Sequence, residues 1–206
     1  MDKKPLVMII LDGFGIGMPD EHNAIHVANT PELDKLMASC PNTIIAASGE
    51  DVGLPVGQVG NSEVGHMNIG AGRVIYQDLS VIMDQISDGR FYANKTYNDV
   101  LDYCSDNDVR LHLMGLLSDG GVHSHIDILY ALMEMAKKHE LSRVFIHAFL
   151  DGRDVGPTTG LDYVRSCVEK CAELDIGKIA TVMGRFYSMD RDRRWARLER
   201  AYRALV

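Results

Sequence analysis

The sequence predicts an α/β protein with a parallel sheet between helices, a three-layer architecture. Two observations carry this prediction. In the second half of the chain, short apolar runs rich in β-branched residues alternate with amphipathic segments at helical spacing. Each apolar run is followed by a polar loop that contains glycine, as at the carboxyl end of a strand in a parallel sheet.

The composition narrows the classes of partner and the cellular compartment that can be expected for the protein. The 206 residues are 46% hydrophobic and 24% charged, with a net charge of −8, which is ordinary for an acidic globular protein and favours neither nucleic acid nor a membrane surface as partner. The apolar run that follows Pro5 has six residues, too few for a signal peptide core or a membrane span. The four cysteines form no Cys-x-x-Cys motif, so we expect a cytoplasmic protein.

The N-terminal part begins with a predicted strand at residues 6–11, continuously apolar as a strand buried on both faces requires. Asp12 follows it, well placed for a metal or phosphate site, although an Asp-Gly pair can also simply turn the chain. Thr30, Pro31 and Glu32 predict the start of a helix that continues to residue 37, and residues 43–47 predict a second strand.

The stretch 57–66 reads Gly-Gln-Val-Gly-Asn-Ser-Glu-Val-Gly-His. Its glycines permit close approach of the backbone to a ligand, and Asn61 or Ser62 can cap a helix that starts near Glu63. Ser62 would then lie at a helix N-terminus, where an anion is stabilised, and could accept a phosphoryl group. An ordinary capped helix after a glycine-rich loop is the alternative.

Beyond residue 72 the pattern changes, and we predict a domain boundary near residues 73–77, with one domain at 1–75 and another at 76–206. Helices are expected at 78–86 and 96–104. The predicted strands lie at 109–117, 143–150 and 178–183, each leading into a helix, and the last helix begins near residue 190. The inward face of the helix after residue 154 is predicted to hold Leu161, Val164, Val168 and Cys171.

The loops after these strands carry His123, Arg153, Asp154, Arg185 and Arg191, which the predicted topology brings to one edge of the sheet. Arginine grips phosphate or carboxylate with a planar fork, so the set suits a small substrate with more than one negative group. Taken singly, each arginine could be a surface charge. His123 could be a loop histidine that is hydrogen-bonded to the backbone and does not bind substrate.

The C-terminal segment 185–203 contains seven arginines. Nucleic-acid binding is one interpretation, but Trp195, Leu198, Tyr202 and Leu205 recur at helical spacing. An amphipathic helix is therefore expected, with Arg194, Arg197 and Arg200 on its solvated face.

Five blocks together closely resemble cofactor-independent phosphoglycerate mutase, a family of the alkaline phosphatase superfamily. They are Leu-Asp12-Gly-Phe-Gly, Gly-Gln-Val-Gly-Asn-Ser62-Glu-Val-Gly-His, Ser-Asp-Gly-Gly-Val-His123-Ser-His, Asp-Gly-Arg153-Asp154 and Gly-Arg185-Phe-Tyr-Ser-Met-Asp-Arg191. The resemblance implies the start of an alkaline-phosphatase-like domain followed by part of a second α/β substrate domain.

The resemblance also implies interconversion of 2- and 3-phosphoglycerate through a phosphoserine, without 2,3-bisphosphoglycerate. Ser62 would be the nucleophile, Asp12 and Ser62 ligands of two divalent metal ions, usually manganese. His123, Arg153, Asp154, Arg185 and Arg191 would bind the small-molecule substrate of a protein that is monomeric when complete.

Members of that family are well over twice this length, and their other metal-binding residues lie in a C-terminal part. We therefore expect the 206 residues to be an N-terminal portion that is inactive alone. Two alternatives remain: another phosphotransferase of the superfamily, such as a phosphopentomutase, and a non-catalytic anion-binding fragment.

Overall fold

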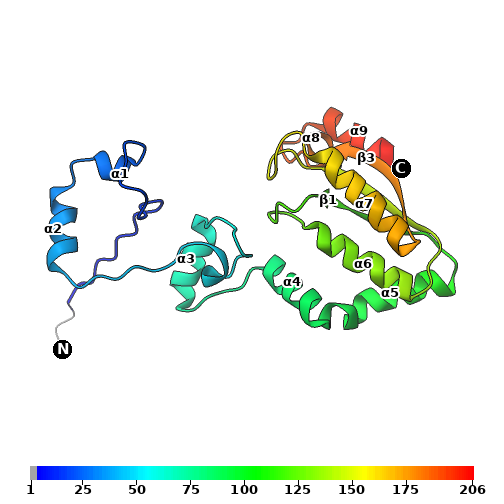
Figure 1. The fold of residues 1–206 in the computed structure, drawn as a ribbon, viewed down its shortest axis with the longest axis horizontal. Helices are drawn as coiled ribbons and strands as arrows, with labels where there is room; N and C mark the ends of the chain where they lie inside the picture. The colour runs from blue at the N-terminus through cyan, green and yellow to red at the C-terminus, as the bar shows by residue number, and fades with distance from the viewer. Residues whose placement is uncertain (1–3) are drawn as a thin grey trace. The chain divides into compact units, whose positions relative to one another are not determined.

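The structure is a computed structural model that describes residues 4–206, and it divides the chain into two compact units that meet between Tyr76 and Gln77. The first unit holds short helices, and the second holds the sheet (Figure 1). In the first unit the elements are α1 (Ala24–Val27), α2 (Pro31–Ser39), the 3-10 helix η1 (Gly49–Val52) and α3 (Ser62–Ala71). In the second unit they are α4 (Asp78–Asp88), η2 (Arg90–Ala93), α5 (Lys95–Asp106), β1 (Leu111–Leu117), α6 (Ile126–Lys138), β2 (Val144–Leu150), α7 (Gly160–Leu174), β3 (Lys178–Gly184), α8 (Arg185–Ser188) and α9 (Trp195–Leu205).

The sheet of the second unit confirms the predicted α/β class. Its strands lie in the order β1-β2-β3, and both neighbouring pairs are parallel. The three chain segments therefore leave the sheet at the same edge, at Leu117, Leu150 and Gly184, which are aligned in register across the strands. Every loop that was expected to carry substrate-binding residues starts at that edge.

The core lies where α6 and α7 pack against the sheet. Ile146 and Ala148 of β2 are 1% exposed, and Met133 of α6 and Cys167 of α7 are fully buried against them. The inward face of α7 was predicted only in part. Val164 and Cys171 pack on this core, but Leu161 and Val168 are 57% and 51% exposed. The small Cys167 faces the sheet instead, so the buried stripe is rotated from the one that hydrophobicity alone indicates.

The helix ends of the second unit follow from local chemistry. Asn94 caps α5 by accepting from the backbone N–H groups of Thr96 and Tyr97, and His125 caps α6 by accepting from that of Asp127. Gly89 ends α4 with φ +86°, a conformation that glycine adopts without a steric penalty. These signals explain why the helices and strands of this unit were predicted within a few residues of their bounds, apart from the last helix, which begins at Trp195.

The first unit contradicts two predicted strands. Residues 6–11 and 43–47 have no strand structure, and their apolar side chains are exposed, Leu6 by 93% and Ile45 by 81%. A strand is completed by hydrogen bonds to a neighbour, and in residues 4–206 no strand pairs with either segment. The predicted helix after Thr30 is confirmed and runs through Ser39. Within the described chain, no helix has the length and apolarity needed to cross a membrane.

Candidate functional site

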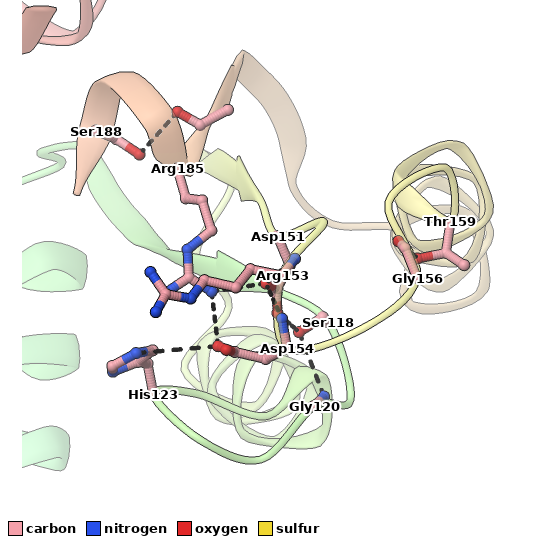
Figure 2. Close-up of polar contacts among 11 residues, drawn as sticks. Ser118, Gly120, His123, Asp151, Arg153, Asp154, Gly156, Thr159, Arg185 and Ser188 are labelled. Carbon is pink, nitrogen blue, oxygen red and sulfur yellow. Dashed lines mark hydrogen bonds and ion pairs between the residues drawn. The ribbon is translucent and has the colours of Figure 1, made fainter. Parts of the chain in front are cut away.

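The loops at the carboxyl edge of the sheet surround a cleft of about 830 Å³. It brings together all five of the substrate-binding residues predicted from the second unit, several of which are drawn in Figure 2. Its charged and titratable lining residues are His123, Arg153, Arg185, Arg191, Arg194, Arg197, Asp151, Asp154, Asp190 and Asp192.

Asp151 is the buried centre of this cleft. Its side chain is 1% exposed, and Oδ2 accepts a hydrogen bond of 2.6 Å from the hydroxyl of Ser118 at the end of β1. Oδ1 accepts from the backbone N–H groups of Arg153 at 3.1 Å and Asp154 at 3.0 Å. These bonds fix the turn after β2 and tie it to the loop after β1, so the two loops are held as one unit.

Burial by itself raises the pKa of Asp151, but the hydrogen bonds from Ser118, the backbone N–H groups and Arg185 outweigh it and lower the pKa. Asp151 is therefore a carboxylate at neutral pH.

Arg185, the first residue of α8, joins the third loop to this network. Its Nη1 lies 2.7 Å from Asp151 Oδ1 and 2.6 Å from Asp154 Oδ2, and its side chain is 15% exposed. Burial tends to lower the pKa of Arg185, but the bonds to Asp154 and Asp151 more than compensate and raise it. The guanidinium is thus permanently charged and already held by two carboxylates (Figure 2).

His123 lies at the mouth of the same group. Its Nε2 is 3.9 Å from Asp154 Oδ2, and the imidazole is 42% exposed, so it faces the cleft and contacts the carboxylate that also holds Arg185 (Figure 2). A second contact fixes the base of this loop, because the Tyr163 hydroxyl of α7 donates to Asp119. Gly120 lies so close to the neighbouring loop that a Cβ atom there would be 3.0 Å from Cβ of Asp154.

Arg153 and Arg191 differ from the other arginines of the cleft. Both are exposed, and neither forms an ion pair with a carboxylate of the described chain. Arg185, Arg194 and Arg197 by contrast contact aspartates. Two uncompensated guanidinium groups beside one cleft provide the positive charge that a polyanionic small molecule requires.

The prediction of a solvated face on α9 was wrong for Arg197. Its guanidinium carbon lies 3.7 Å from the ring centroid of Phe186, Nη1 is 3.4 Å from Asp190 Oδ1, and the side chain is 25% exposed. On the predicted apolar face, Trp195 and Tyr202 are 69% and 62% exposed. The helix is amphipathic, but its buried stripe centres on Ala201, which is 4% exposed.

Sequence reasoning did not single out two buried carboxylates of the cleft, Asp151 and Asp190. Asp151 has a signal in the sequence, since it is the first residue after an apolar strand, as Ser118 and Arg185 are after theirs. Asp190 has a weaker one. It lies four residues before Arg194 in a cluster of arginines, a spacing that is usually a surface ion pair.

Ser62 is the first residue of α3 in the other unit. The helix is capped by Asn61, whose side chain accepts from the backbone N–H of Val64 at 3.0 Å, so the predicted cap is confirmed for Asn61. The Ser62 hydroxyl is exposed and 3.2 Å from Nδ1 of His66. That nitrogen is also 2.8 Å from the Ser62 carbonyl oxygen, which can only accept. Nδ1 therefore carries the proton in this bond and cannot take one from the hydroxyl.

Asp12 belongs to the same unit as Ser62 and lies in an exposed turn, closed by the bond from Phe14 N to Leu11 O at 3.1 Å. Nothing in the described residues brings Asp12 into a group of three or more histidine, cysteine or acidic side chains that could hold a metal. The residues present therefore do not make up the predicted metal centre by themselves.

The fold and the cleft define an α/β protein with an arginine-lined cleft at the carboxyl edge of a parallel sheet. Residues 82–206 match the family described as the BPG-independent PGAM N-terminus. The chain belongs to this family, which confirms the resemblance identified in its motifs.

Two kinds of relatives support the assignment. Named 2,3-bisphosphoglycerate-independent phosphoglycerate mutases from Clostridium perfringens and Methanococcoides burtonii are 53% and 55% identical, over 100% and 99% of this chain. A crystal structure of Leishmania mexicana phosphoglycerate mutase, studied at low cobalt concentration, has a TM-score of 0.74 and 38% identity and covers 95% of this chain. The chain spans 40%, 39% and 37% of the lengths of these three relatives.

Proposed function

We propose that the protein carrying this chain interconverts 2-phosphoglycerate and 3-phosphoglycerate without 2,3-bisphosphoglycerate, with Ser62 as the transient phosphoryl acceptor. The relatives named above are phosphoglycerate mutases. The observation that carries the proposal is the pair of uncompensated guanidinium groups, Arg153 and Arg191, at the mouth of the cleft. We assign the phosphoryl-accepting role to residues 1–75 and substrate binding to residues 76–206, in a cytoplasmic, monomeric enzyme.

The substrate carries a carboxylate and a phosphate, and the cleft offers complementary groups. Arg153 and Arg191 can each form two parallel hydrogen bonds with such a group. Arg185 is held by Asp151 and Asp154, so it presents its remaining N–H groups in a fixed orientation. Asp154 accepts hydrogen bonds, and we propose that it holds a glycerate hydroxyl, with His123 beside it.

The reaction transfers one phosphoryl group twice. In the first half, the Ser62 oxygen bonds to phosphorus as the ester bond to the glycerate oxygen breaks, so the proton lost by Ser62 is balanced by the one gained by glycerate. In the second half, the other hydroxyl of the retained glycerate attacks phosphorus, and the serine hydroxyl is restored. The exposed position of Ser62 at the N-terminus of a ten-residue helix suits a group that becomes an anion.

The arginine cleft would retain glycerate between the halves. If glycerate left, water would have to take the phosphoryl group from Ser62, and the net reaction would be hydrolysis of phosphoglycerate.

We further propose that the enzyme uses two divalent metal ions, manganese foremost, and that Asp12 and Ser62 are two of the oxygen ligands. Hydroxyl and carboxylate oxygens suit manganese. A complete centre needs more ligands than these two, and no group of sufficient size occurs in residues 4–206.

The test is a coupled assay of 2-phosphoglycerate formation from 3-phosphoglycerate in the full-length protein, with and without 2,3-bisphosphoglycerate and after chelation of metals. Turnover without the bisphosphate is expected, and Ser62→Ala should abolish it because a methyl group cannot accept a phosphoryl group. A control variant in the same helix should leave the structure intact. Asn68→Ala does not meet this condition, because the Asn68 side chain bonds to the backbone of Val52 and Ile75.

Glu63→Gln is the better control, because Glu63 is exposed and adjacent. Retention of more than about one per cent of turnover by Ser62→Ala, with Glu63→Gln unchanged, would contradict the covalent route.

Turnover on a phosphopentose but not on phosphoglycerate would favour another phosphotransferase of the superfamily. Binding without any turnover in the full-length protein would favour an anion-binding role.

A further inference from the structure

The turn between α8 and α9 is built around a single carboxylate. The side chain of Asp190 is 3% exposed, and its Oδ2 accepts from the backbone N–H of Arg194 at 2.9 Å and of Asp192 at 3.2 Å. Oδ1 lies 3.4 Å from Nη1 of Arg197, whose guanidinium stacks on Phe186. Asp190 thus connects the turn to α9, and Arg197 connects α9 to Phe186 of α8.

The same turn contains an unfavourable backbone conformation. Arg193 has φ +61°, in the left-handed region that residues with a Cβ rarely adopt. It lies between Asp192 and Arg194, the residues whose N–H groups Asp190 accepts. Those bonds close the chain over Arg193 and stabilise a conformation that the sequence does not favour on its own.

Arg191 lies between Asp190 and the two residues whose N–H groups Asp190 accepts. It follows Asp190 directly, lines the cleft, and has no carboxylate partner in the part of the chain described. An exposed side chain without partners of its own can only be positioned by its backbone. That backbone is fastened on one side by Asp190 and on the other by the turn that Asp190 closes.

We propose that Asp190 is a positioning residue, which orients Arg191 toward the substrate through the turn at residues 191–194 and stabilises the left-handed Arg193 within it. Asp190 borders the cleft, but its side chain is only 3% exposed and both of its oxygens already have partners within the chain, so we assign it a positioning role. The proposal rests on the proposed function in one respect, the role of Arg191 in binding phosphoglycerate.

The proposal predicts that a second substitution, at Arg193, compensates in part for the loss of Asp190. Asp190→Ala removes the acceptor for both N–H groups and leaves Arg193 strained. Arg193→Gly removes that strain, because glycine adopts positive φ readily. The double variant should therefore recover part of what Asp190→Ala loses, an effect that a general loss of packing would not produce. Asp190→Asn keeps one carbonyl acceptor for the turn and loses the charge that faces Arg197, so an intermediate effect is expected.

The experiment uses the full-length protein and four variants, Asp190→Ala, Asp190→Ala with Arg193→Gly, Arg191→Ala as benchmark, and Glu199→Gln as control. Glu199 lies on α9 outside the cleft and pairs with Arg203 at 2.6 Å. Asp190→Ala should raise KM for 3-phosphoglycerate about tenfold, approaching the effect of Arg191→Ala, with kcat changed less than about twofold. The double variant should regain at least half of this loss on a logarithmic scale, and Glu199→Gln should not differ from the parent.

A second readout does not depend on activity. Trp195, the one tryptophan of the sequence, follows the turn directly and is 69% exposed. Its fluorescence and the hydrogen exchange of the Arg194 amide should change in Asp190→Ala and return toward the parent in the double variant.

Unchanged exchange at Arg194, or a raised KM for Arg191→Ala but not for Asp190→Ala, would overturn the proposal. If Arg191→Ala leaves KM unchanged while the enzyme still converts phosphoglycerate, the role of Arg191 is wrong, and the positioning role fails with it although the mutase function stands.

Discussion

At the residue scale, the arginines of the cleft fall into two kinds. Arg185 is held by Asp151 and Asp154 at 2.7 and 2.6 Å, whereas Arg153 and Arg191 have no carboxylate partner in residues 4–206. An arginine that is already paired contributes orientation, and one without a partner contributes attraction for an anion. Their substitutions should therefore have different consequences, and the unpaired arginines are the ones that test the binding role directly.

Arg153→Lys is expected to weaken binding of 3-phosphoglycerate by about 1–3 kcal/mol, because an ammonium group keeps the charge but cannot form the two parallel bonds of a guanidinium fork. Binding is measured by calorimetry, and leakage of inorganic phosphate during turnover is measured alongside. Arg165→Lys is the matched control, since Arg165 lies on α7 with a 65% exposed side chain and pairs with Asp162. Equal affinity for both variants and the parent would make Arg153 an ordinary surface charge.

At the scale of the elements, the chain positions its cleft by contacts between loops. Ser118, Asp151 and Arg185 each follow a strand directly and are hydrogen-bonded in series. The βα alternation predicted that these loops would meet at one edge. It could not predict the contacts between them, because the acceptor of a hydroxyl or a guanidinium depends on register, and nothing in the local sequence sets the register of β1 against β2.

Gly120→Ala is expected to raise KM several-fold and to cost about 1–3 kcal/mol of stability, because the added Cβ would lie 3.0 Å from Cβ of Asp154 and 3.2 Å from Cγ1 of Val155. Chemical denaturation and steady-state kinetics measure the two effects. Gly115→Ala serves as the control, since its Cβ would meet only Ser124 Oγ at 3.9 Å, an ordinary contact. Similar KM values and stabilities for the two variants would mean that the two loops can move apart to make room for the added methyl group.

A second cross-strand contact links all three strands through a buried histidine. His147 of β2 is 6% exposed, with Nε2 2.9 Å from Nδ1 of His112 and Nδ1 2.9 Å from the hydroxyl of Thr181. Burial, and then repulsion from His112, lowers the pKa of His147, so the folded state favours the neutral imidazole. The stabilisation by neutral His147 is complete above the unfolded pKa of about 6.5 and is lost as pH falls through the lower folded pKa.

The free energy of unfolding should therefore fall between about pH 7 and pH 5 more steeply for the parent than for His147→Gln. The measurement is urea denaturation at several pH values, followed by circular dichroism. His139→Gln is a suitable comparison, because His139 lies at the end of α6, away from the sheet, where its ring nitrogens contact Asp102 and Asn98 at 2.9 Å. Identical slopes for the parent and His147→Gln would show that His147 does not titrate over this range.

At the scale of the whole molecule, sequence reasoning succeeded where a segment and its partners lie in the same unit. The helices and strands after residue 77 have their hydrogen-bond partners and core within that unit, and nearly all were recognised. Residues 6–11 have the composition of a buried strand but are exposed, because hydrophobicity specifies burial without specifying the neighbour. The same limit applies to the metal centre that we propose at Asp12 and Ser62, which no group in the described chain completes.

We expect the 206-residue chain alone to bind 3-phosphoglycerate weakly in the cleft of the second unit and to show no turnover. The cleft is built entirely from residues after 121, whereas Asp12 and Ser62 provide too few ligands for a metal centre. Calorimetric titration with 3-phosphoglycerate and with manganese, followed by the mutase assay, tests both halves. Tight, stoichiometric manganese binding with turnover would contradict this expectation, and loss of 3-phosphoglycerate binding in Arg153→Lys would locate the bound ligand.

The contact between Gly120 and Asp154 also limits how the protein can evolve. A side chain at position 120 would collide with a residue of the next loop, and Cβ there would also lie 3.4 Å from Oδ2 of Asp151. The two loops therefore cannot accumulate substitutions independently, although about thirty positions separate them in the sequence. Among descendants of this sequence, replacement of that glycine should appear only after, or together with, a rearrangement of the turn after β2. The order in which mutations are accepted is thus constrained by the close packing of one glycine against the next loop.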